Sequence, residues 1–167
     1  AHMYSNFVNH QQNNENNNST IEFPAISLVV SGGHTELYLM KSVKNLVWLG
    51  GTLDDAAGEA FDKTARLLGF GNRGGVAIQE AASQLRIENC KLKITLPRPM
   101  IHDDSLNFSF SGLKTAILRE VNKLKTNQQF NNETIQQLAY ETQEAITDVL
   151  VAKTIKAAQI HGVKSIL

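Results

Sequence analysis

The segment AISLVVSGGHTELYLM, residues 25–40, decides the fold of this chain. Its first half is a run of aliphatic and β-branched residues, which is typical of a buried strand. Its second half alternates apolar and polar side chains and predicts a partner strand. Between them, Gly32 and Gly33 suit a two-residue turn with positive φ at both positions. A third strand is predicted over NLVWLGG, residues 45–51, so the segment opens an antiparallel meander.

Helical patterns follow the meander. Residues 54–68 predict an amphipathic helix, with Asp54 as its N-cap and Gly69 as its stop. The other expected elements are a helix over 77–86, a strand or extended segment over 91–100, a helix entered through the serine-rich stretch 108–124, and a long helix over 133–161. Strands followed by helices around one core predict an α/β fold.

Composition limits the classes of function. The chain has 167 residues, enough for one domain, and its 16 basic residues balance its 16 acidic ones. A zero net charge argues against a strongly basic nucleic-acid domain, but it leaves RNA binding through a local patch or a partner open. The single cysteine, Cys90, forms no internal disulfide framework and fits a reducing compartment.

Both ends of the sequence suggest a piece of a longer protein. Residues 9–20 are rich in Asn and Gln and predict a disordered loop. The last residues, GVKSIL, predict a strand that is just beginning, and residues 1–3 resemble a cloning scar. The apolar runs are too short to span a bilayer and no secretory signal is visible. We therefore expect no membrane partner.

The helix over 54–68 carries a stripe of carboxylates. At about 100° per residue, Asp55, Glu59 and Asp62 share one face. One interpretation is a solvated face with two ion pairs, Glu59 with Lys63 and Asp62 with Arg66. The other is an acidic stripe facing a cleft, where a carboxylate accepts hydrogen bonds from ribose hydroxyls.

Three glycine-containing stretches allow two interpretations each. Ser31, Gly32 and Gly33 either turn a hairpin or present backbone N–H groups to an anion, with His34 beside them as a donor or base. The pair at 74–75 either links two elements or lets a ligand approach the backbone. The stretch FSFSGLK either caps a helix with its serines or meets an anion at the helix N-terminus. His102, Asp103 and Asp104 fit a solvated turn better than a metal site.

Five stretches together resemble one family. VVSGGHTEL, GGTLDDAAGEAFDKTARLLG, RGG, LPRP and FSFSGLKTA occur in an order and at a spacing similar to the second lobe of the TsaD family, formerly labelled O-sialoglycoprotein endopeptidases. The resemblance covers roughly residues 23–167. It implies an actin-like, sugar-kinase-like ATPase lobe, here an incomplete chain, in which residues 1–20 end the preceding lobe and residues 21–167 form the second lobe.

The resemblance also implies a reaction. Such enzymes transfer the threonylcarbamoyl group from threonylcarbamoyl-AMP to N6 of the adenosine beside the anticodon, in tRNAs that read codons beginning with A. The implied partners are tRNA and TsaB-like and TsaE-like proteins of the same synthesis complex. The implied location is the cytoplasm, or alternatively a mitochondrion or another organelle.

Particular residues follow from the resemblance. The family's substrate loop matches Val29, Val30, Ser31, Gly32 and Gly33.

Beyond that loop, Asp62 matches the family's nucleotide-contacting carboxylate and Gly75 matches its later substrate glycine. Glu59 is expected near the cleft. The family usually has Pro-Gly-Gly-Pro where this chain has Arg-Gly-Gly-Val, and an acidic residue often stands at Gln79, which hydrogen-bonds a hydroxyl without charge.

The resemblance further implies one divalent metal ion, iron or zinc. On this alignment His2 is the second histidine of an HxxxH motif, and residues 1–3 are native. The first histidine, an aspartate in an NGAMIA-like motif and an asparagine in a GGVSAN-like segment fall outside this chain. Two other hypotheses stand beside the transferase: a non-catalytic paralogue that acts as a scaffold in the same pathway, and a metalloprotease, which lacks an HExxH motif.

Overall fold

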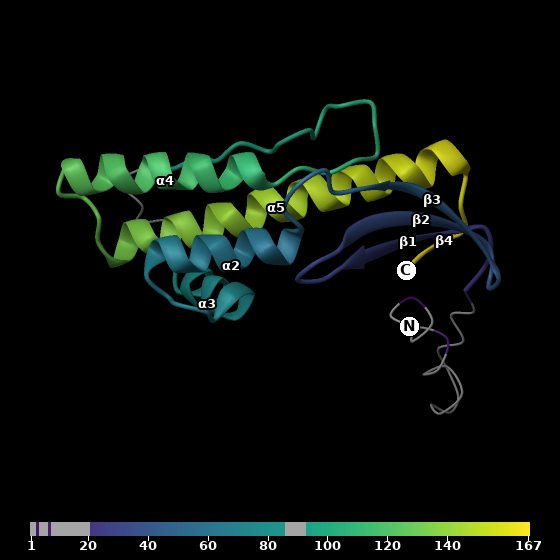
Figure 1. The fold of residues 1–167 in the computed structure, drawn as a ribbon, viewed down its shortest axis with the longest axis horizontal. Coiled ribbons are helices and arrows are strands. Elements are labelled where there is room, and N and C mark those ends of the chain that lie inside the picture. The colour runs from purple at the N-terminus through teal and green to yellow at the C-terminus, as the bar shows by residue number, and fades with distance from the viewer. Residues whose placement is uncertain (1–2, 4–6, 8–20, 86–92) are drawn as a thin grey trace.

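The computed structural model describes residues 3, 7, 21–85 and 93–167. A four-stranded sheet occupies one end of the elongated molecule (Figure 1), in the order β3-β2-β1-β4. The strands β1 (Ala25–Val30), β2 (Thr35–Ser42) and β3 (Asn45–Gly51) form the predicted antiparallel meander. A short strand β4 (Ser165–Ile166) follows the last helix and pairs parallel to β1, so the strand expected in GVKSIL is confirmed.

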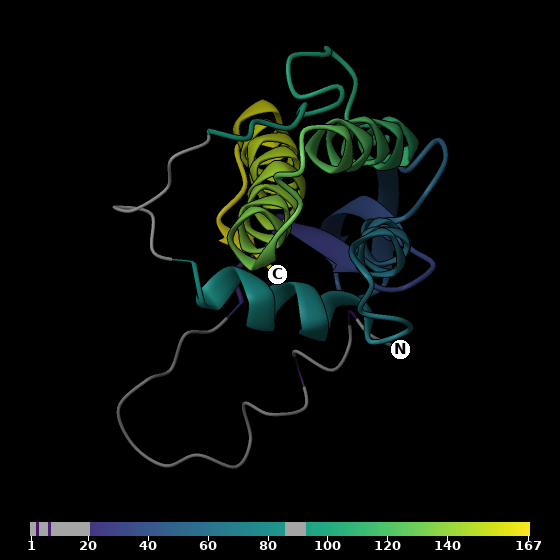
Figure 2. The ribbon, with the colours of Figure 1, turned by 90° about the vertical axis from the view of Figure 1, so that its left-hand side faces the viewer.

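Four helices make up the rest of the lobe. They are α2 (Ala57–Leu68), α3 (Gly74–Ser83), α4 (Ser111–Thr126) and α5 (Asn132–His161). The long α5 runs from the other helices to the sheet and contacts α2, α3, β1 and β2. Viewed from the helical end, α3 lies across α2 and α5 (Figure 2). The mixed α/β class expected from the sequence is therefore present.

The core joins the sheet to the helices. Ile26 of β1 pairs with Leu39 of β2, and both side chains are buried. The rings of Phe108 and Phe110 stack with centroids 6.3 Å apart just before α4. Fully buried aliphatic side chains of α4 and α5 complete the core: Leu113, Ile117, Leu138, Ile146 and Val149. Because apolar burial stabilises by about 25 cal/mol per Å², these contacts hold the helices on the sheet.

Some helix ends follow their local signals. α2 stops at Gly69, whose φ is 90°, as predicted. α5 begins with a capping box in which Asn131 Oδ1 accepts from the N–H of Thr134 at 3.1 Å. It ends at Gly162, whose φ is 55°.

Other predicted boundaries are wrong. α2 begins at Ala57, three residues later than predicted, and Asp54 does not cap it. α3 begins at Gly74 rather than at residue 77. The segment expected over 91–100 as a strand or an extended stretch forms no strand pairing over residues 93–98, which leaves the extended form. Ile94 and Leu96 alternate there with exposed neighbours and are buried.

The glycine turn also differs from the prediction. Val30 pairs with Thr35, so four residues rather than two connect β1 to β2. Neither Gly32 nor Gly33 lies in the left-handed region of φ. The longer loop removes the need for positive φ, because that need belongs to two-residue hairpin turns.

Several predictions concern residues outside the described part. His2, Cys90 and the loop over 9–20 belong to this group. The division at residue 20 stays a prediction. Among the described residues, no helix is both long enough and apolar enough to cross a membrane.

Candidate functional site

The first turn of α2 lies directly against the glycine loop. The N–H of Gly58 donates to the Ser31 carbonyl at 3.3 Å. A methyl group at Gly58 would lie 2.6 Å from that carbonyl oxygen and 2.7 Å from Gly32 Cα, so only glycine permits this approach. Thr35 Oγ1, fully buried at the start of β2, accepts from the N–H of Ala57 at 2.9 Å. This bond explains why α2 begins at Ala57.

The loop itself is held by its own serine. Ser31 Oγ accepts from the N–H groups of Gly33 at 3.4 Å and His34 at 3.1 Å. Among the described residues, the N–H of Gly32 has no hydrogen-bond partner. Nothing lies within 4 Å of the position a side chain would take on Gly32 or Gly33. The loop therefore keeps one free donor and open space on its outer side, while the Ser31 hydroxyl can still donate its proton.

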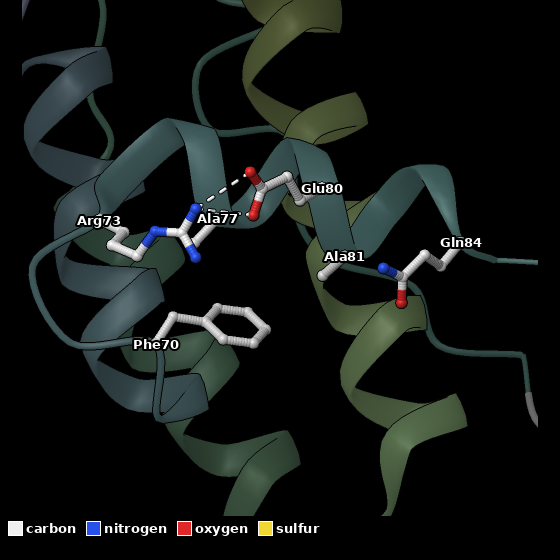
Figure 3. A pocket seen from close by; sticks show the side chains of 6 residues that line it. All are labelled: Phe70, Arg73, Ala77, Glu80, Ala81 and Gln84. Atoms are coloured by element: carbon white, nitrogen blue, oxygen red, sulfur yellow. Dashed lines mark hydrogen bonds and ion pairs between the residues drawn. The ribbon is translucent and has the colours of Figure 1, made fainter.

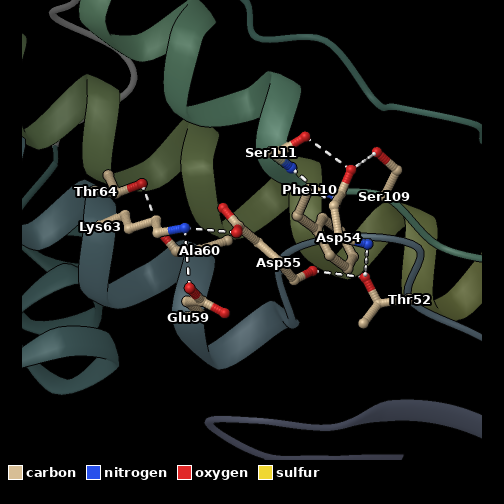
Figure 4. A network of polar contacts seen from close by, with 10 residues as sticks. All are labelled: Thr52, Asp54, Asp55, Glu59, Ala60, Lys63, Thr64, Ser109, Phe110 and Ser111. Carbon is tan, nitrogen blue, oxygen red and sulfur yellow. Dashed lines mark hydrogen bonds and ion pairs between the residues drawn. The ribbon is translucent and has the colours of Figure 1, made fainter.

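One lysine forms ion pairs with two carboxylates of the predicted stripe, Asp55 and Glu59 (Figure 4). Lys63 Nζ lies 2.5 Å from Asp55 and 2.9 Å from Glu59. Hydrogen bonds to Asp55 and then Glu59 raise the pKa of the Lys63 amine, so it stays charged. The predicted pair of Glu59 with Lys63 is confirmed. The pair of Lys63 with Asp55 was not predicted, so the structure contains one of the two ion pairs that the solvated-face interpretation expected.

Asp62 is different. Within the described ranges it makes no ion pair and no hydrogen bond, and the predicted pair with Arg66 is not formed. The side chain is half-buried. It projects from α2 one turn after Gly58, and side chains four residues apart lie about 5–6 Å from each other on one helix face. The carboxylate thus stands one turn along α2 from the glycine loop, with its charge unpaired.

The start of α3 packs against the Asp62 side chain. Gly74, the first residue of α3, lies so close to Asp62 that a methyl group there would overlap the Oδ1 atom. Gly75 is half-buried beside Phe61, and Gln79 is exposed one turn further along α3. The structure therefore brings the 31–33 loop, Asp62 and the glycines at 74–75 together along α2.

The remaining predicted residues lie at the edge of this arrangement or outside the described part. Val29 and Val30 end β1, and Val30 is exposed. His34 is exposed at the end of the loop. Glu59 forms an ion pair with Lys63 through one carboxylate oxygen, and its expected place near the cleft stays a prediction. His2, the expected metal ligand, is not among the described residues.

A hollow of about 210 Å³ lies elsewhere on the lobe (Figure 3). It is lined by Phe70, Arg73, Ala77, Glu80, Ala81 and Gln84. Arg73 crosses its rim and donates to both carboxylate oxygens of Glu80 at 3.0 Å. None of the predicted site residues lines this hollow.

Asp54 joins two segments that are far apart in the sequence, a contact that the sequence pattern did not predict (Figure 4). Its Oδ1 accepts from the backbone N–H of Phe110 at 2.8 Å and of Ser111 at 3.1 Å. Its Oδ2 accepts from the Ser109 hydroxyl at 2.6 Å and the Ser111 hydroxyl at 2.7 Å. Asp54 therefore caps α4, and the two serines bind this carboxylate instead of capping the helix themselves.

These bonds set the charge state of Asp54. Burial alone would raise the pKa of its carboxyl group. The hydroxyls of Ser109 and Ser111, followed by the N–H groups of Phe110 and Ser111, outweigh burial and bring the pKa below its ordinary value. The carboxylate is therefore ionised at neutral pH, and a negative charge is favourable near a helix N-terminus.

The described residues contain no cluster of three His, Cys, Asp or Glu side chains that could hold a metal ion. His102 stands in the turn before α4, where Asp103 Oδ1 accepts from the N–H of Ser105 at 2.7 Å. The interpretation of this segment as turn chemistry is consistent with that bond. The described part of this chain therefore does not fit a metal centre by itself.

A meander followed by helices and a strand parallel to β1 defines the class: a mixed α/β lobe of the actin-like ATPase type, with a glycine loop against an acid-bearing helix. The family model TsaD, described as tRNA N6-adenosine threonylcarbamoyltransferase, matches residues 1–167. The chain belongs to the TsaD family.

Curated relatives agree with the family model. A tRNA N6-adenosine threonylcarbamoyltransferase of Syntrophomonas wolfei is 48% identical over 167 residues, which is the whole of this chain and 45% of the relative. Proteins of the same name from Persephonella marina and a Sulfurihydrogenibium species are 44% and 42% identical over the whole chain, and the matches cover 43% and 44% of them. The chain thus spans less than half the length of these relatives.

Proposed function

We propose that the full-length protein containing this chain transfers a threonylcarbamoyl group from threonylcarbamoyl-AMP to N6 of the adenosine beside the anticodon of tRNA. The proposal rests on the family and on one observation: Asp62 is unpaired between the open glycine loop and the start of α3. A charged side chain left unpaired beside an open loop favours a polar ligand, whereas the nearby carboxylates of Asp55 and Glu59 both pair with Lys63.

The reaction is acyl transfer from a mixed carboxylic–phosphoric anhydride. AMP is a good leaving group, so the protein mainly positions the carbonyl near the adenine amine and stabilises the developing negative charge. The Gly32 N–H and the Ser31 hydroxyl supply donors for an anionic oxygen of the substrate. Asp62 accepts hydrogen bonds from the ribose hydroxyls, which are donors that suit a carboxylate. Gly75 and Gln79 lie beside the same part of the ligand.

The further attributes implied by the resemblance are also proposals for the full-length protein. They are a divalent metal ion, iron or zinc, with His2 as one ligand; partners of the TsaB-like and TsaE-like kind; and a location in the cytoplasm or an organelle. A metal ion would act as a Lewis acid on the substrate's oxygens. The roles given to Ser31, Gly32 and Asp62 use hydrogen-bonding groups of this chain alone.

Replacing the unpaired carboxylate tests the proposal. In the full-length protein, Asp62→Ala is expected to lower threonylcarbamoyl transfer about tenfold to a hundredfold, the range that loss of a charge-assisted hydrogen bond produces. The variant stays folded, because Asp62 supports no ion pair or hydrogen bond among the described residues. The measurement is the threonylcarbamoyladenosine content of tRNA after incubation with the purified enzyme system.

The matched control is Asp104→Ala, which removes a fully exposed carboxylate from the 101–107 segment and leaves transfer unchanged. Normal tRNA modification by Asp62→Ala would refute the assignment. A calorimetric titration with a threonylcarbamoyl-AMP analogue tests the scaffold hypothesis separately. A transferase binds the analogue, whereas a scaffold would not. Nothing in the comparisons favours the scaffold or the metalloprotease.

A further inference from the structure

Gly74 has two unusual properties for the first residue of a helix. Its φ is +48°, a conformation that residues with a side chain rarely adopt, and it is buried. Its Cα lies against the side chain of Asp62. A methyl group built on Gly74 would overlap Asp62 Oδ1 and would lie 3.2 Å from Cγ. The absent side chain therefore leaves the space that the carboxylate occupies.

No polar partner in the described residues fixes the Asp62 carboxylate. Arg66, one turn along the helix, forms no ion pair with Asp62, Lys63 pairs with Asp55 and Glu59, and Arg73 pairs with Glu80. Packing against Gly74 is thus the contact that defines where the carboxylate points. A carboxylate that is positioned by packing alone can accept hydrogen bonds from a ligand. A carboxylate in an ion pair already has a partner.

We infer that Gly74 is a positioning residue, which keeps the Asp62 carboxylate at the start of α3 by leaving room for it. The role of Asp62 towards the ligand rests on the proposed function; the steric relation between the two residues does not. The carboxylate is the mobile end of a side chain, so a methyl group at 74 would turn it away rather than unfold the lobe. We therefore expect Gly74→Ala to reduce ligand affinity mainly, without unfolding the lobe.

The chain offers a matched control for backbone strain. Gly71 has a similar φ of +67°, and nothing lies within 4 Å of the place where its side chain would be. Gly71→Ala carries the strain of a left-handed alanine without any overlap. The two variants of the full-length protein are expected to lose similar amounts of thermal stability, roughly 2–4 °C in Tm.

The binding measurement uses a threonylcarbamoyl-AMP analogue and calorimetry on the full-length protein. Gly74→Ala is expected to weaken binding about tenfold or more, and Gly71→Ala to leave it unchanged. In a background of Asp62→Ala, adding Gly74→Ala should weaken binding no further, because the group it displaces is already gone. Equal affinity of Gly74→Ala and Gly71→Ala would overturn the inference. So would an equal loss on Gly74→Ala with and without Asp62.

A crystal structure of the Gly74→Ala protein separates this inference from the proposed function. The inference expects the Asp62 carboxylate to have rotated away from residue 74, whether or not the protein binds an adenylate. If the carboxylate keeps its place and the backbone of α3 has shifted instead, Gly74 does not position Asp62. If the carboxylate has rotated but the wild-type protein binds no adenylate analogue, the steric inference stands and the proposed function fails.

Discussion

Asp54 connects two segments that lie 55 to 57 residues apart in the chain. It receives four hydrogen bonds from residues 109–111 and so satisfies backbone donors at the start of α4 that the helix itself cannot satisfy. The same carboxylate immediately precedes Asp55 and α2. A single side chain therefore sets the distance between the helix that bears Asp62 and the helix that follows the phenylalanine pair.

Asp54→Asn is expected to destabilise the protein by about 1 kcal/mol, because the amide nitrogen that replaces one carboxylate oxygen cannot accept the hydrogen bonds that this oxygen receives. Because the folded pKa of Asp54 lies below its unfolded value, its stabilisation is complete above about pH 4 and is lost as pH falls through the folded pKa. The difference in the free energy of unfolding between wild type and Asp54→Asn should therefore be largest at pH 7 and become smaller in acid. Urea titrations at several pH values measure it.

Thr126→Ala serves as the control, since the Thr126 hydroxyl lies on α4 and donates to the Asn122 carbonyl rather than to a carboxylate. Its stability difference from wild type should not follow the titration of Asp54. A gap between Asp54→Asn and wild type that stays constant from neutral pH down to pH 3 would show that the ionised carboxylate is not the cap.

At the scale of elements, α2 and the glycine loop form one unit. Thr35 caps the first N–H of α2, and Gly58 brings its first turn against Ser31 and Gly32. Two helix starts in this lobe are thus capped by residues distant in sequence, α2 by Thr35 and α4 by Asp54. Sequence rules for helix starts consider only residues just before the helix. They therefore predicted Asp54 as the cap of α2.

Gly58→Ala tests this unit. In a free helix the change would stabilise by up to about 1 kcal/mol, because alanine is the better helix former. Here the added methyl meets the backbone of Ser31 and Gly32 at 2.6 and 2.7 Å, and overpacking typically costs about 1–3 kcal/mol. We expect a net loss of about 1 kcal/mol in the free energy of unfolding, measured by chemical denaturation.

Gly112→Ala is the matched control, since Gly112 lies in α4 with nothing within 4 Å of its side-chain position. That variant should be as stable as wild type or more stable. If Gly58→Ala behaves in the same way as Gly112→Ala, α2 is not seated on the glycine loop as described.

At the scale of the whole molecule, most elements and the pairing of neighbouring strands could be predicted from the sequence, whereas the contacts between distant segments could not. The third strand and the two long helices follow from periodicity over many residues, and their predicted bounds agree closely with β3, α4 and α5. The turn at Gly32 and Gly33 was predicted wrongly because strand register, which sets loop length, depends on the pairing of both strands.

The candidate site shows the same division. Helical spacing placed Asp55, Glu59 and Asp62 on one face but gave no means of telling them apart. Lys63 pairs with Asp55 and Glu59 but not with Asp62. The Asp62 carboxylate lies in the space beside Gly74. The family resemblance supplied Asp62 as a ligand contact, whereas Gly58 and Gly74 required the packing of α2 against its neighbours.

The central claim is that the glycine loop and Asp62 belong to one adenylate site. The most direct test is a crystal structure of the full-length protein with a non-reactive threonylcarbamoyl-AMP analogue. The account predicts that the Gly32 N–H lies within hydrogen-bond distance of a substrate oxygen, and that a ribose hydroxyl of the same molecule donates to Asp62. An analogue bound with either residue out of contact would contradict the account.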